Sequence, residues 1–427
     1  MKITDVRTVL LTGPCTNDPF LSECRKHRSA AFIEIHADNG LVGIGESYNG
    51  YRCAELYPPA VDCFAPILLG RNVDDVPRLW QWMYQCEQFW CRTGFGIGVI
   101  NGIEAALWDL KGQHEGKPVY ELLGGLQHES LPAYATGGPS KYPKERLAAK
   151  IDHYLALGFR GVKLGTGALD EEGFEQRLSA DEAAAFEADK LAFVRDRYGA
   201  ALTVCLDAHM GNRPEGAGEW DVETAAAVCQ AVEPYDLFFF EEPLHYDNLD
   251  GYSELCRRAN VPIAGGECLT GLPEWRAFIE KDCFDIGQPD ASFTGGLKLC
   301  VDVAKLLEQR GRAVAMHAWG AGGSLMQNIH VGFACQNTAI LEIAPDYGPL
   351  HSAIIGDSFQ MREGRVLPPA KPGLGIALTD EVKRRFRFVP GSGEFNDVPG
   401  KKLSDWEDQV DAELARRALH TSAQPTT

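Results

Sequence analysis

The sequence lacks the features of several protein classes. No apolar run approaches the roughly 20 residues that a membrane-spanning helix needs, and residues 1–13 become polar too early for the apolar region of a signal peptide. No block of lysine and arginine occurs, and 41 basic against 60 acidic residues leave a formal net charge of -19. Because nucleic-acid binding relies on clustered positive charge, we expect neither a membrane nor a nucleic acid as a partner.

Closely spaced cysteine pairs are also missing. The 13 cysteines contain no Cys-x-x-Cys motif, and an odd number excludes a framework in which every cysteine is paired. Scattered thiols of this kind are typical of a reducing compartment. We therefore expect a cytoplasmic protein whose cysteines are small core residues.

The composition is that of an ordinary globular protein, with 45% hydrophobic and 24% charged residues in a chain of 427. At roughly 150 residues per domain, this length allows two or three domains or one large barrel with an attached module. Residues 1–125 begin with two alternating segments joined by Asp38-Asn39-Gly40, a strong hairpin signal. An amphipathic helix is expected over 98–112, which makes this zone an α+β module.

Residues 126–345 have a different pattern. Short apolar runs that end in a polar residue recur eight times, with helical segments such as Ala180–Tyr198 between them. Buried strands separated by helices are typical of parallel βαβ units, and eight of them favour a closed barrel, although an open doubly wound sheet also fits. Residues 346–427 contain no further unit and are expected to pack against the first module. The predicted fold class is therefore α/β, with a smaller α+β domain.

Almost every apolar run of the expected barrel ends in an ionisable residue. In parallel barrels the active site is built at the carboxyl ends of the strands. The residues at these ends are Lys163, Asp207, His209, Glu241, Glu242, Glu267, Asp290, His317 and Glu342. This succession of acids, lysine and histidines predicts a catalytic site at that end of the barrel.

Asp207, Glu241 and Glu267 end three consecutive runs. Adjacent strands lie roughly 4.8 Å apart, so three inward carboxylates at one level come close together and, without a counter-charge, would repel and take up protons. A hard divalent cation relieves this repulsion, and carboxylate oxygens suit Mg²⁺. Zinc is disfavoured because no Cys/His cluster accompanies them. The alternative is that these carboxylates cap the helices that follow.

Strand alternation orients the neighbours of these acids. Glu241 and Glu242 are expected to point to opposite faces, so that only one of them faces the barrel interior. Asp207 and His209 are two residues apart and are expected on the same side of their strand. His209 is then close to a metal ligand, unless it is a core or loop histidine bonded to a backbone carbonyl.

Asp290 and His317 end adjacent runs. An aspartate behind an imidazole fixes its tautomer and supports the imidazolium, so this pair is a candidate general base. The alternative is that Asp290 and His317 form a hydrogen bond with a purely structural role. Lys163 is expected to hold or polarise an anion, with a surface lysine as the alternative.

Taken together, the motifs resemble those of the enolase superfamily, in particular its mandelate racemase-like branch, which contains acid-sugar dehydratases. The resemblance implies a (β/α)7β TIM-like barrel with an α+β capping domain formed by both ends of the chain. It also implies one Mg²⁺ on Asp207, Glu241 and Glu267, and chemistry that removes the proton α to a carboxylate. The motifs extend over nearly the whole chain and are GLVGIGES, GIEAALWDLKG, PVYELLGG, GFRGVKLG, LDAH, FFFEEPL, PIAGGE, QPDAS and AMHAW.

Two departures from the racemase pattern narrow the expected activity. Racemases carry Lys-x-Lys where this chain has Lys-Leu-Gly from Lys163, so the second lysine base is missing. The triplet Asp-Ala-His from Asp207 is similar to that of galactonate dehydratases. We therefore expect a hydro-lyase that converts an aldonate such as galactonate into a 2-keto-3-deoxy acid. A cycloisomerase, epimerase or racemase of a related sugar acid is the alternative, and a non-catalytic barrel would be expected to lack these residues.

The resemblance also implies roles for the residues around the metal. His317, oriented by Asp290, would remove the α-proton, and His209 would protonate the departing hydroxyl, unless His317 performs both transfers. Lys163 would lie near the substrate carboxylate. Glu342 would donate a hydrogen bond to the enediolate if it is protonated.

Substrate specificity is expected to come from the cap. Segment 20–28 contains Arg25, His27 and Arg28, which could bind hydroxyls or a distal carboxylate, although a solvated run of charges explains the segment equally well. Trp319 could line the same pocket. The family forms dimers or octamers, so a homo-oligomer that takes a small sugar acid is expected.

Overall fold

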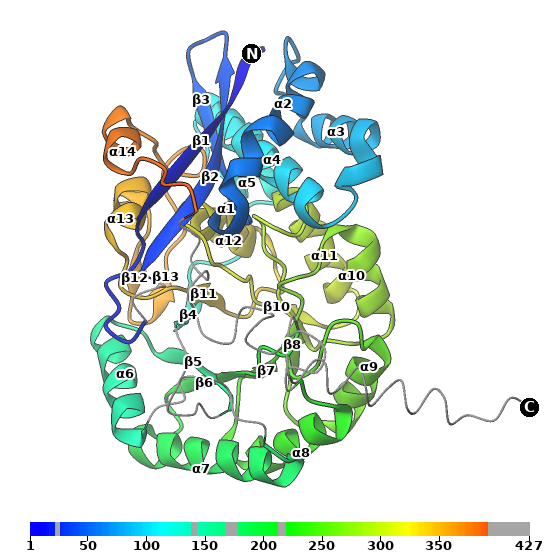
Figure 1. Ribbon diagram of the computed structural model, residues 1–427, viewed down its shortest axis with the longest axis vertical. Helices are drawn as coiled ribbons and strands as arrows, with labels where there is room; N and C mark the ends of the chain where they lie inside the picture. The colour runs from blue at the N-terminus through cyan, green and yellow to red at the C-terminus, as the bar shows by residue number, and fades with distance from the viewer. Residues whose placement is uncertain (22–25, 138–142, 168–177, 212–218, 392–427) are drawn as a thin grey trace, which may run out of the picture.

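The computed structural model describes residues 1–21, 26–137, 143–167, 178–211 and 219–391. Within these ranges the chain forms a capping domain at one end and a barrel at the other (Figure 1). No helix in them is both long and apolar enough to cross a membrane. Their cysteines are free thiols.

A three-stranded antiparallel sheet forms one layer of the cap. The expected hairpin joins its second and third strands, and Gly40 in the turn has a left-handed backbone with φ 85°. The strands are β1 (Ile3–Pro14), β2 (His27–Ala37) and β3 (Val42–Ser47). The smaller helices of the cap are α1 (Gly50–Cys53), the 3₁₀ turn η2 (Ala54–Leu56), α2 (Tyr57–Leu68), α3 (Val76–Cys91) and α5 (Val119–Leu123).

The long helix α4 (Gly94–Glu115) lies at the centre of the cap. Its expected amphipathic character is wrong, because nearly all of its middle turns are buried. One side packs on β3, where a Cβ on Gly43 or Gly45 would stand 2.1 or 2.2 Å from a carbonyl oxygen of the helix. These two glycines permit the close approach of helix and strand. Other sides contact α3 and a barrel helix, α11 (Leu297–Glu308).

Parallel strands and alternating helices form the barrel, and the expected (β/α)7β fold is confirmed. β11 pairs with β4, and a bridge from Val314 to Thr338 joins the other edge, so the sheet closes on itself. The strands are β4 (Leu131–Ala135), β5 (Gly161–Gly165), β6 (Thr203–Asp207), β7 (Phe239–Glu241), β8 (Ile263–Gly265), β9 (Ile286–Gly287), β10 (Ala313–Val314) and β11 (Leu341–Ile343). The helices between them, besides α11, are α6 (Lys144–Ala156), α7 (Ala180–Tyr198), α8 (Val222–Val232) with the 3₁₀ turn η3 (Glu233–Tyr235), α9 (Leu249–Arg258), α10 (Gly271–Glu280) and α12 (Gly323–Ala334).

Two buried carboxylates of the cap hold loops of the barrel. Glu104 in α4 accepts a hydrogen bond from the backbone N–H of Leu297 at 2.7 Å, in the first turn of α11, where negative charge is favourable. Glu46 in β3 accepts from Ala321 at 2.6 Å and from Ser324 at 2.8 Å, which follow β10. Burial raises the pKa of both carboxyls to about 7. The cap therefore fixes the backbone beyond the carboxyl ends of two barrel strands.

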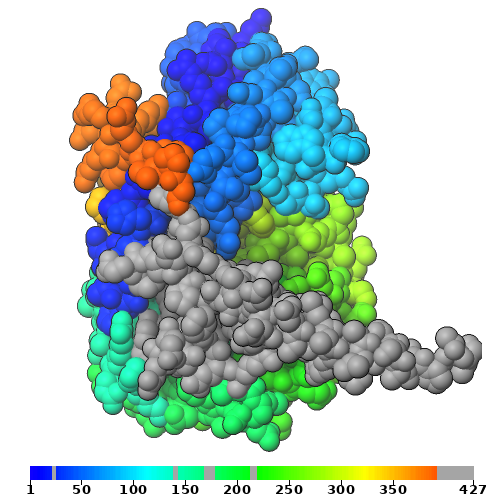
Figure 2. Space-filling view, viewed as in Figure 1, coloured from blue at the N-terminus to red at the C-terminus, as the bar shows by residue number. Residues whose placement is uncertain are grey.

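After the barrel the chain returns to the cap. α13 (Pro349–Ile355) packs on β1, and the N–H of Thr12 donates to the carbonyl oxygen of Phe386 at 3.0 Å. In Figure 2 the orange C-terminal residues lie beside the blue N-terminal residues at the same end of the molecule. The last part of the expected third zone, residues 392–427, lies outside the described residues. The other elements of this zone are β12 (Met361–Arg362), β13 (Arg365–Val366) and α14 (Asp380–Arg385).

Candidate active site

Lys163 is the centre of a buried charge cluster at the carboxyl ends of the barrel strands. Its Nζ lies 2.9 Å from each carboxylate oxygen of Glu241, 2.9 Å from Oε1 of Glu342 and 3.2 Å from Oδ2 of Asp207. None of these side chains is more than 7% exposed. A surface position for Lys163 is thereby excluded, and one ammonium group faces three carboxyl groups.

The members of this cluster shift one another's pKa values. Burial by itself lowers the pKa of Lys163, but Glu241, Glu342 and Asp207 outweigh it and raise this pKa well above its ordinary value. Burial and then the charge of Asp207 raise the pKa of Glu241. Burial by itself would raise the pKa of Glu342, yet the Lys163 ammonium group holds the pKa of that carboxyl below its usual range. The pKa values of these groups therefore depend on one another, and the cluster holds fewer positive than negative groups.

Glu267 brings another carboxylate to the edge of this cluster. One of its oxygens, one oxygen of Glu242 and the Sγ of Cys268 lie within 4.8 Å of one another, the one group with metal-ligand spacing that the described residues contain. Oε2 of Glu242 is buried and accepts no hydrogen bond, and Oδ2 of Asp207 is buried with the Lys163 ammonium group at 3.2 Å as an ion-pair partner. Buried carboxylate oxygens in excess over the single ammonium group fit a hard divalent cation.

The sequence named Asp207, Glu241 and Glu267 as ligands. Asp207 and Glu241 occupy paired positions of β6 and β7 and share the Lys163 ammonium group between them. Glu267 follows β8 and has Glu242 as its near neighbour instead. Two of the three predicted ligands therefore meet at Lys163, whereas Glu267 lies nearest to Glu242 and Cys268.

Glu242, which strand alternation placed on the face opposite to that of Glu241, lies beside Glu267. β7 ends at Glu241, and Glu242 has a left-handed backbone with φ 46°, so the alternation of the strand no longer applies. Its Oε1 accepts a hydrogen bond from the hydroxyl of Tyr246. Burial and then the charge of Glu267 raise the pKa of Glu242 well above its ordinary value. The position of Glu242 beside Glu267 thus follows from this turn of the backbone and not from strand alternation.

His317 and Asp290 form the expected pair. Nδ1 of His317 lies 2.7 Å from Oδ2 of Asp290, and both residues are buried. The other carboxylate oxygen of Asp290 accepts hydrogen bonds from Ser292 and from Nδ2 of Asn328, the latter at 2.9 Å, and these residues hold the aspartate in place. Sequence reasoning missed both, because neither is at a strand end.

The second nitrogen of His317 points toward the acidic site. Nε2 lies 3.5 Å from Oε2 of Glu267 and 4.0 Å from Oε2 of Glu342. Burial by itself lowers the pKa of His317, but Glu267, Glu342 and Asp290 raise it to about 10. The pair and the charge cluster are therefore parts of one site.

His209 follows β6 instead of continuing it. Its backbone is left-handed, with φ 50°, so strand alternation is not what brings it to Asp207. The contact nevertheless exists, since Nδ1 of His209 lies 2.9 Å from Oδ1 of Asp207. The His209 side chain is 47% exposed, which leaves it accessible on the outer side of the predicted ligand.

Tyr48 is a further residue of the site that the sequence did not reveal. It follows β3 in the cap, and its ring lies edge-on to the ring of His317 with centroids 5.6 Å apart. Burial and then Tyr51 raise the pKa of its phenol well above the ordinary value. Its place directly after the GLVGIGES motif is the only signal in the sequence, and its contact depends on how the cap docks.

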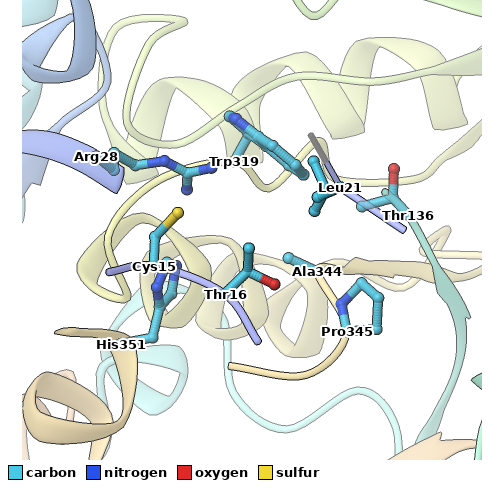
Figure 3. A pocket seen from close by; sticks show the side chains of 9 residues that line it. All are labelled: Cys15, Thr16, Leu21, Arg28, Thr136, Trp319, Ala344, Pro345 and His351. Carbon is cyan, nitrogen blue, oxygen red and sulfur yellow. The ribbon is translucent and has the colours of Figure 1, made fainter. Parts of the chain in front are cut away.

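A pocket lies between cap and barrel (Figure 3). The expected Trp319 lines it, and the guanidinium carbon of Arg28 stands 4.5 Å from the centroid of the Trp319 ring. His27 is exposed and is not among the lining residues, and Arg25 lies outside the described residues. The lining residues are Cys15, Thr16, Leu21, Arg28, Thr136, Trp319, Ala344, Pro345 and His351.

Two family descriptions match this chain. Residues 146–382 match the enolase C-terminal domain-like family, and residues 9–124 match the N-terminal domain of the mandelate racemase and muconate lactonizing enzyme family. Together they account for the cap and for most of the barrel.

Curated relatives are similar over most of their length. An arabinonate dehydratase of Saccharolobus solfataricus is 30% identical over 83% of this chain and 89% of its own. A D-galactonate dehydratase of Pectobacterium atrosepticum is 30% identical over 82% of this chain and 89% of its own. A D-galactarolactone cycloisomerase of Agrobacterium fabrum is 28% identical over 91% of this chain and 99% of its own.

Solved structures show the same fold. A racemase from Streptomyces coelicolor with bound magnesium superposes with a TM-score of 0.76 and 26% identity, covering 90% of this chain and 99% of its own. The 3,6-anhydro-D-galactonate cycloisomerase from Zobellia galactanivorans has a TM-score of 0.76 and 25% identity, with the same coverage. Different reactions are therefore named among the relatives of this fold.

Proposed function

Because the chain belongs to the mandelate racemase-like branch of the enolase superfamily, we propose that it is a Mg²⁺-dependent hydro-lyase that dehydrates a sugar acid, an aldonate such as galactonate. One observation carries this proposal. The Asp290–His317 pair directs Nε2 of His317 to within 3.5 Å of Glu267, at the edge of a buried group of carboxylates. A base beside a cation site is the arrangement that proton removal next to a carboxylate requires.

The residues present fit a magnesium ion. Asp207, Glu241 and Glu267 would hold it, since the buried carboxyl groups around Lys163 outnumber its single ammonium group. When bound, Mg²⁺ stabilises negative charge on the substrate carboxylate and thereby makes the neighbouring C–H bond more acidic. Lys163 would contribute its ammonium group at the same end of the substrate.

His317 would accept the α-proton. It does so only as a neutral imidazole, and the surrounding carboxylates raise its pKa to about 10. Positive charge in the acidic site opposes this effect and favours the neutral form. Asp290 keeps Nδ1 as the donor in their hydrogen bond, so that Nε2 is the nitrogen that takes the proton.

His209 would protonate the leaving group. As the α C–H bond breaks, its electron pair passes into the substrate carboxylate, and the C–O bond to the β-hydroxyl then breaks. A proton from His209, which is accessible beside Asp207, allows that hydroxyl to leave as water. The remaining enol tautomerises: its β-carbon takes up a proton, its hydroxyl group loses one, and the product is a 2-keto-3-deoxy acid.

A cycloisomerase is the second candidate, because relatives named D-galactarolactone cycloisomerase and 3,6-anhydro-D-galactonate cycloisomerase cover nearly the whole chain. Both reactions can use the same base and metal. Analysis of the products from a panel of aldonic acids and sugar lactones with Mg²⁺ separates the two. A 2-keto-3-deoxy acid supports the dehydratase, whereas ring opening or closure without loss of water identifies a cycloisomerase.

A further inference from the structure

We propose that Glu46 of the cap is a positioning residue for the base of the reaction, and that it holds Asp290 through two serine hydroxyl groups. The base is then completely assembled only when the cap is docked on the barrel. This inference rests on the proposed function, because it concerns the proton that His317 would remove, and it adds a residue from outside the barrel.

A series of hydrogen bonds leads from Glu46 to His317. Oε2 of Glu46 accepts from the backbone N–H of Ser324 at 2.8 Å, and Oγ of Ser324 lies 2.7 Å from Oγ of Ser292. The Ser292 hydroxyl donates to Oδ1 of Asp290 at 2.6 Å, and Oδ2 of Asp290 lies 2.7 Å from Nδ1 of His317. Each of these residues is at most 5% exposed, so bulk water does not compete for the hydrogen bonds between them.

The hydroxyl groups of this series donate toward Asp290. Because an ionised carboxylate only accepts, the Ser292 hydroxyl uses its hydrogen on Oδ1 of Asp290, and its oxygen accepts from the Ser324 hydroxyl. Oδ1 also accepts from the backbone N–H of Ser292 at 2.7 Å and from Nδ2 of Asn328 at 2.9 Å. Three donors on one oxygen fix the carboxylate, and the other oxygen is directed at Nδ1 of His317.

Two glycines make room for the Glu46 carboxylate at the start of α12. A Cβ on Gly320 would stand 2.9 Å from Oε1 of Glu46, and a Cβ on Gly323 would stand 2.7 Å from its Cβ. One carboxylate oxygen accepts from the backbone N–H of Ala321 and the other from that of Ser324, where the positive end of the helix favours an anion. The residue before α12 is a glycine and provides no side-chain acceptor. Glu46 therefore fixes the first turn of this helix.

The backbone of Glu46 makes a second connection to α12. Its N–H donates to Oε1 of Gln327 at 2.8 Å, and Nε2 of Gln327 donates to the carbonyl oxygen of Glu46 at 3.2 Å. The next residue, Asn328, donates to Asp290 and accepts from the backbone N–H of Ala291 at 2.8 Å. α12 thus lies where the cap strands meet the barrel (Figure 1). Because these contacts do not use the Glu46 side chain, we expect α12 to stay docked when that side chain is replaced.

The test is a double-mutant cycle on Glu46→Gln and Ser324→Ala, measured as α-proton exchange in D₂O with Mg²⁺. The pH is kept above 7, because burial raises the pKa of Glu46 to about 7. Glutamine can accept only with its single amide oxygen, and alanine removes the hydroxyl link. We expect each variant to lower kcat about tenfold with little change in KM. The double variant is expected to be no slower than the slower single variant, because both changes break the same link.

Two results of this cycle overturn the inference. One is a double variant in which the two losses multiply, to about a hundredfold, because Glu46 would then act by a route that does not include the Ser324 hydroxyl. The other is a folded Ser324→Ala variant with the wild-type rate of exchange. This variant keeps the backbone N–H that Glu46 binds, so its result counts even if Glu46→Gln does not fold.

Asp109→Asn is the matched control. Asp109 is also a buried carboxyl group of the cap, and burial likewise raises its pKa to about 7. It accepts from the backbone N–H groups of Ile44 at 2.8 Å and of Leu374 at 2.7 Å, which lie before and after the barrel in the chain. We expect Asp109→Asn to lower the unfolding temperature and to leave exchange by the folded protein unchanged. An equal loss of exchange in this variant would contradict a specific role for Glu46.

The NMR signal of the histidine ring separates this inference from the proposed function. In protein labelled with ¹⁵N-histidine, the Nδ1–H of His317 that is bonded to Asp290 should give a slowly exchanging resonance, which His317→Asn removes. We expect this resonance to shift or broaden in Glu46→Gln and in Ser324→Ala, and to stay unchanged in Asp109→Asn. An unchanged resonance in the first two variants overturns the inference. A changed resonance in a protein that exchanges no acid refutes the proposed function and leaves the positioning role of Glu46.

Discussion

At the scale of single residues, the two histidines of the site occupy different environments. His317 is buried and bonded to Asp290 at 2.7 Å, whereas the side chain of His209 is 47% exposed beside Asp207. A base that must keep one tautomer benefits from the first environment, and an acid that must reach the leaving group benefits from the second. The geometry thus favours different roles for the two rings.

We expect replacement of the two histidines to separate the two proton transfers. His317→Asn keeps a side chain that can hydrogen-bond to Asp290 but removes the base, so α-proton exchange in D₂O falls about a hundred- to ten-thousandfold. His209→Asn retains exchange and loses water elimination. Both rates are followed by NMR on the same sample, with thermal unfolding as the control for folding. Dehydration that persists in both variants contradicts these roles.

Removal of the Lys163 ammonium group should make stability depend on magnesium. Lys163→Met leaves the carboxyl groups of Asp207, Glu241 and Glu342 without their cation, at a cost of roughly 3–5 kcal/mol in unfolding free energy without divalent ions. Mg²⁺ supplies positive charge to the same groups, so its stabilising effect is larger in this variant than in wild type. The measurement is urea unfolding with and without MgCl₂.

Lys190→Met is the matched control for that experiment. Lys190 is also buried and pairs with Glu187 at 2.6 Å, on α7. We expect its loss to destabilise the protein without any added response to Mg²⁺. An equal magnesium response in both lysine variants would show that the Lys163 cluster is not the cation site.

At the scale of elements, the sequence predicts strands better than it predicts the residues just beyond them. The runs of the barrel and the ionisable residues at their ends can be read from short apolar segments, because buried parallel strands leave that pattern. The left-handed backbone of Glu242 and of His209, each just after its strand ends, was not predicted, although the expected closeness of His209 to Asp207 is present. Nothing in strand alternation reveals such a change of φ.

Contacts between elements were the second feature that could not be predicted from the sequence. The burial of α4 on nearly all sides and the approach of Tyr48 to His317 both depend on how the cap docks on the barrel. The sequence predicted a helix and a hairpin there, but a pattern within one element does not identify its neighbours. The cap residues of the site were therefore only partly predicted.

A histidine between two helices should make stability fall in acid. His330 in α12 is buried, and its Nδ1 accepts a hydrogen bond from the N–H of Tyr120 in α5 at 3.2 Å. Burial lowers its pKa from 6.5 to about 3. Between these values the unfolded chain binds a proton that the folded protein does not, so this group removes about 1.4 kcal/mol of stability per pH unit as pH falls.

His330→Asn tests this dependence, because an asparagine oxygen can replace Nδ1 as the acceptor. Urea unfolding at a series of pH values should give a shallower loss of stability below pH 6.5 in the variant than in wild type. The exposed His114→Asn variant is the control for replacing a histidine. Parallel curves for wild type and His330→Asn would contradict a neutral, buried His330.

At the scale of the whole molecule, the site is assembled from distant parts of the chain. Barrel strands and the loops after them supply the acids, the lysine and the base pair, while the cap supplies Tyr48 and the carboxylates of Glu46 and Glu104 that hold barrel loops. The ionisable groups of the site thus belong to the barrel, and the cap fixes the backbone around them.

The central claim is that a divalent cation and His317 together remove the proton next to a carboxylate. It is tested most directly by incubating the wild-type protein with a panel of sugar acids in D₂O and following the α-hydrogen by NMR, before and after chelation. We predict loss of the α-hydrogen signal with at least one acid in the presence of Mg²⁺, its arrest by EDTA and its return when Mg²⁺ is restored. Exchange that is indifferent to chelation, or no exchange with any acid in saturating Mg²⁺, would contradict the account.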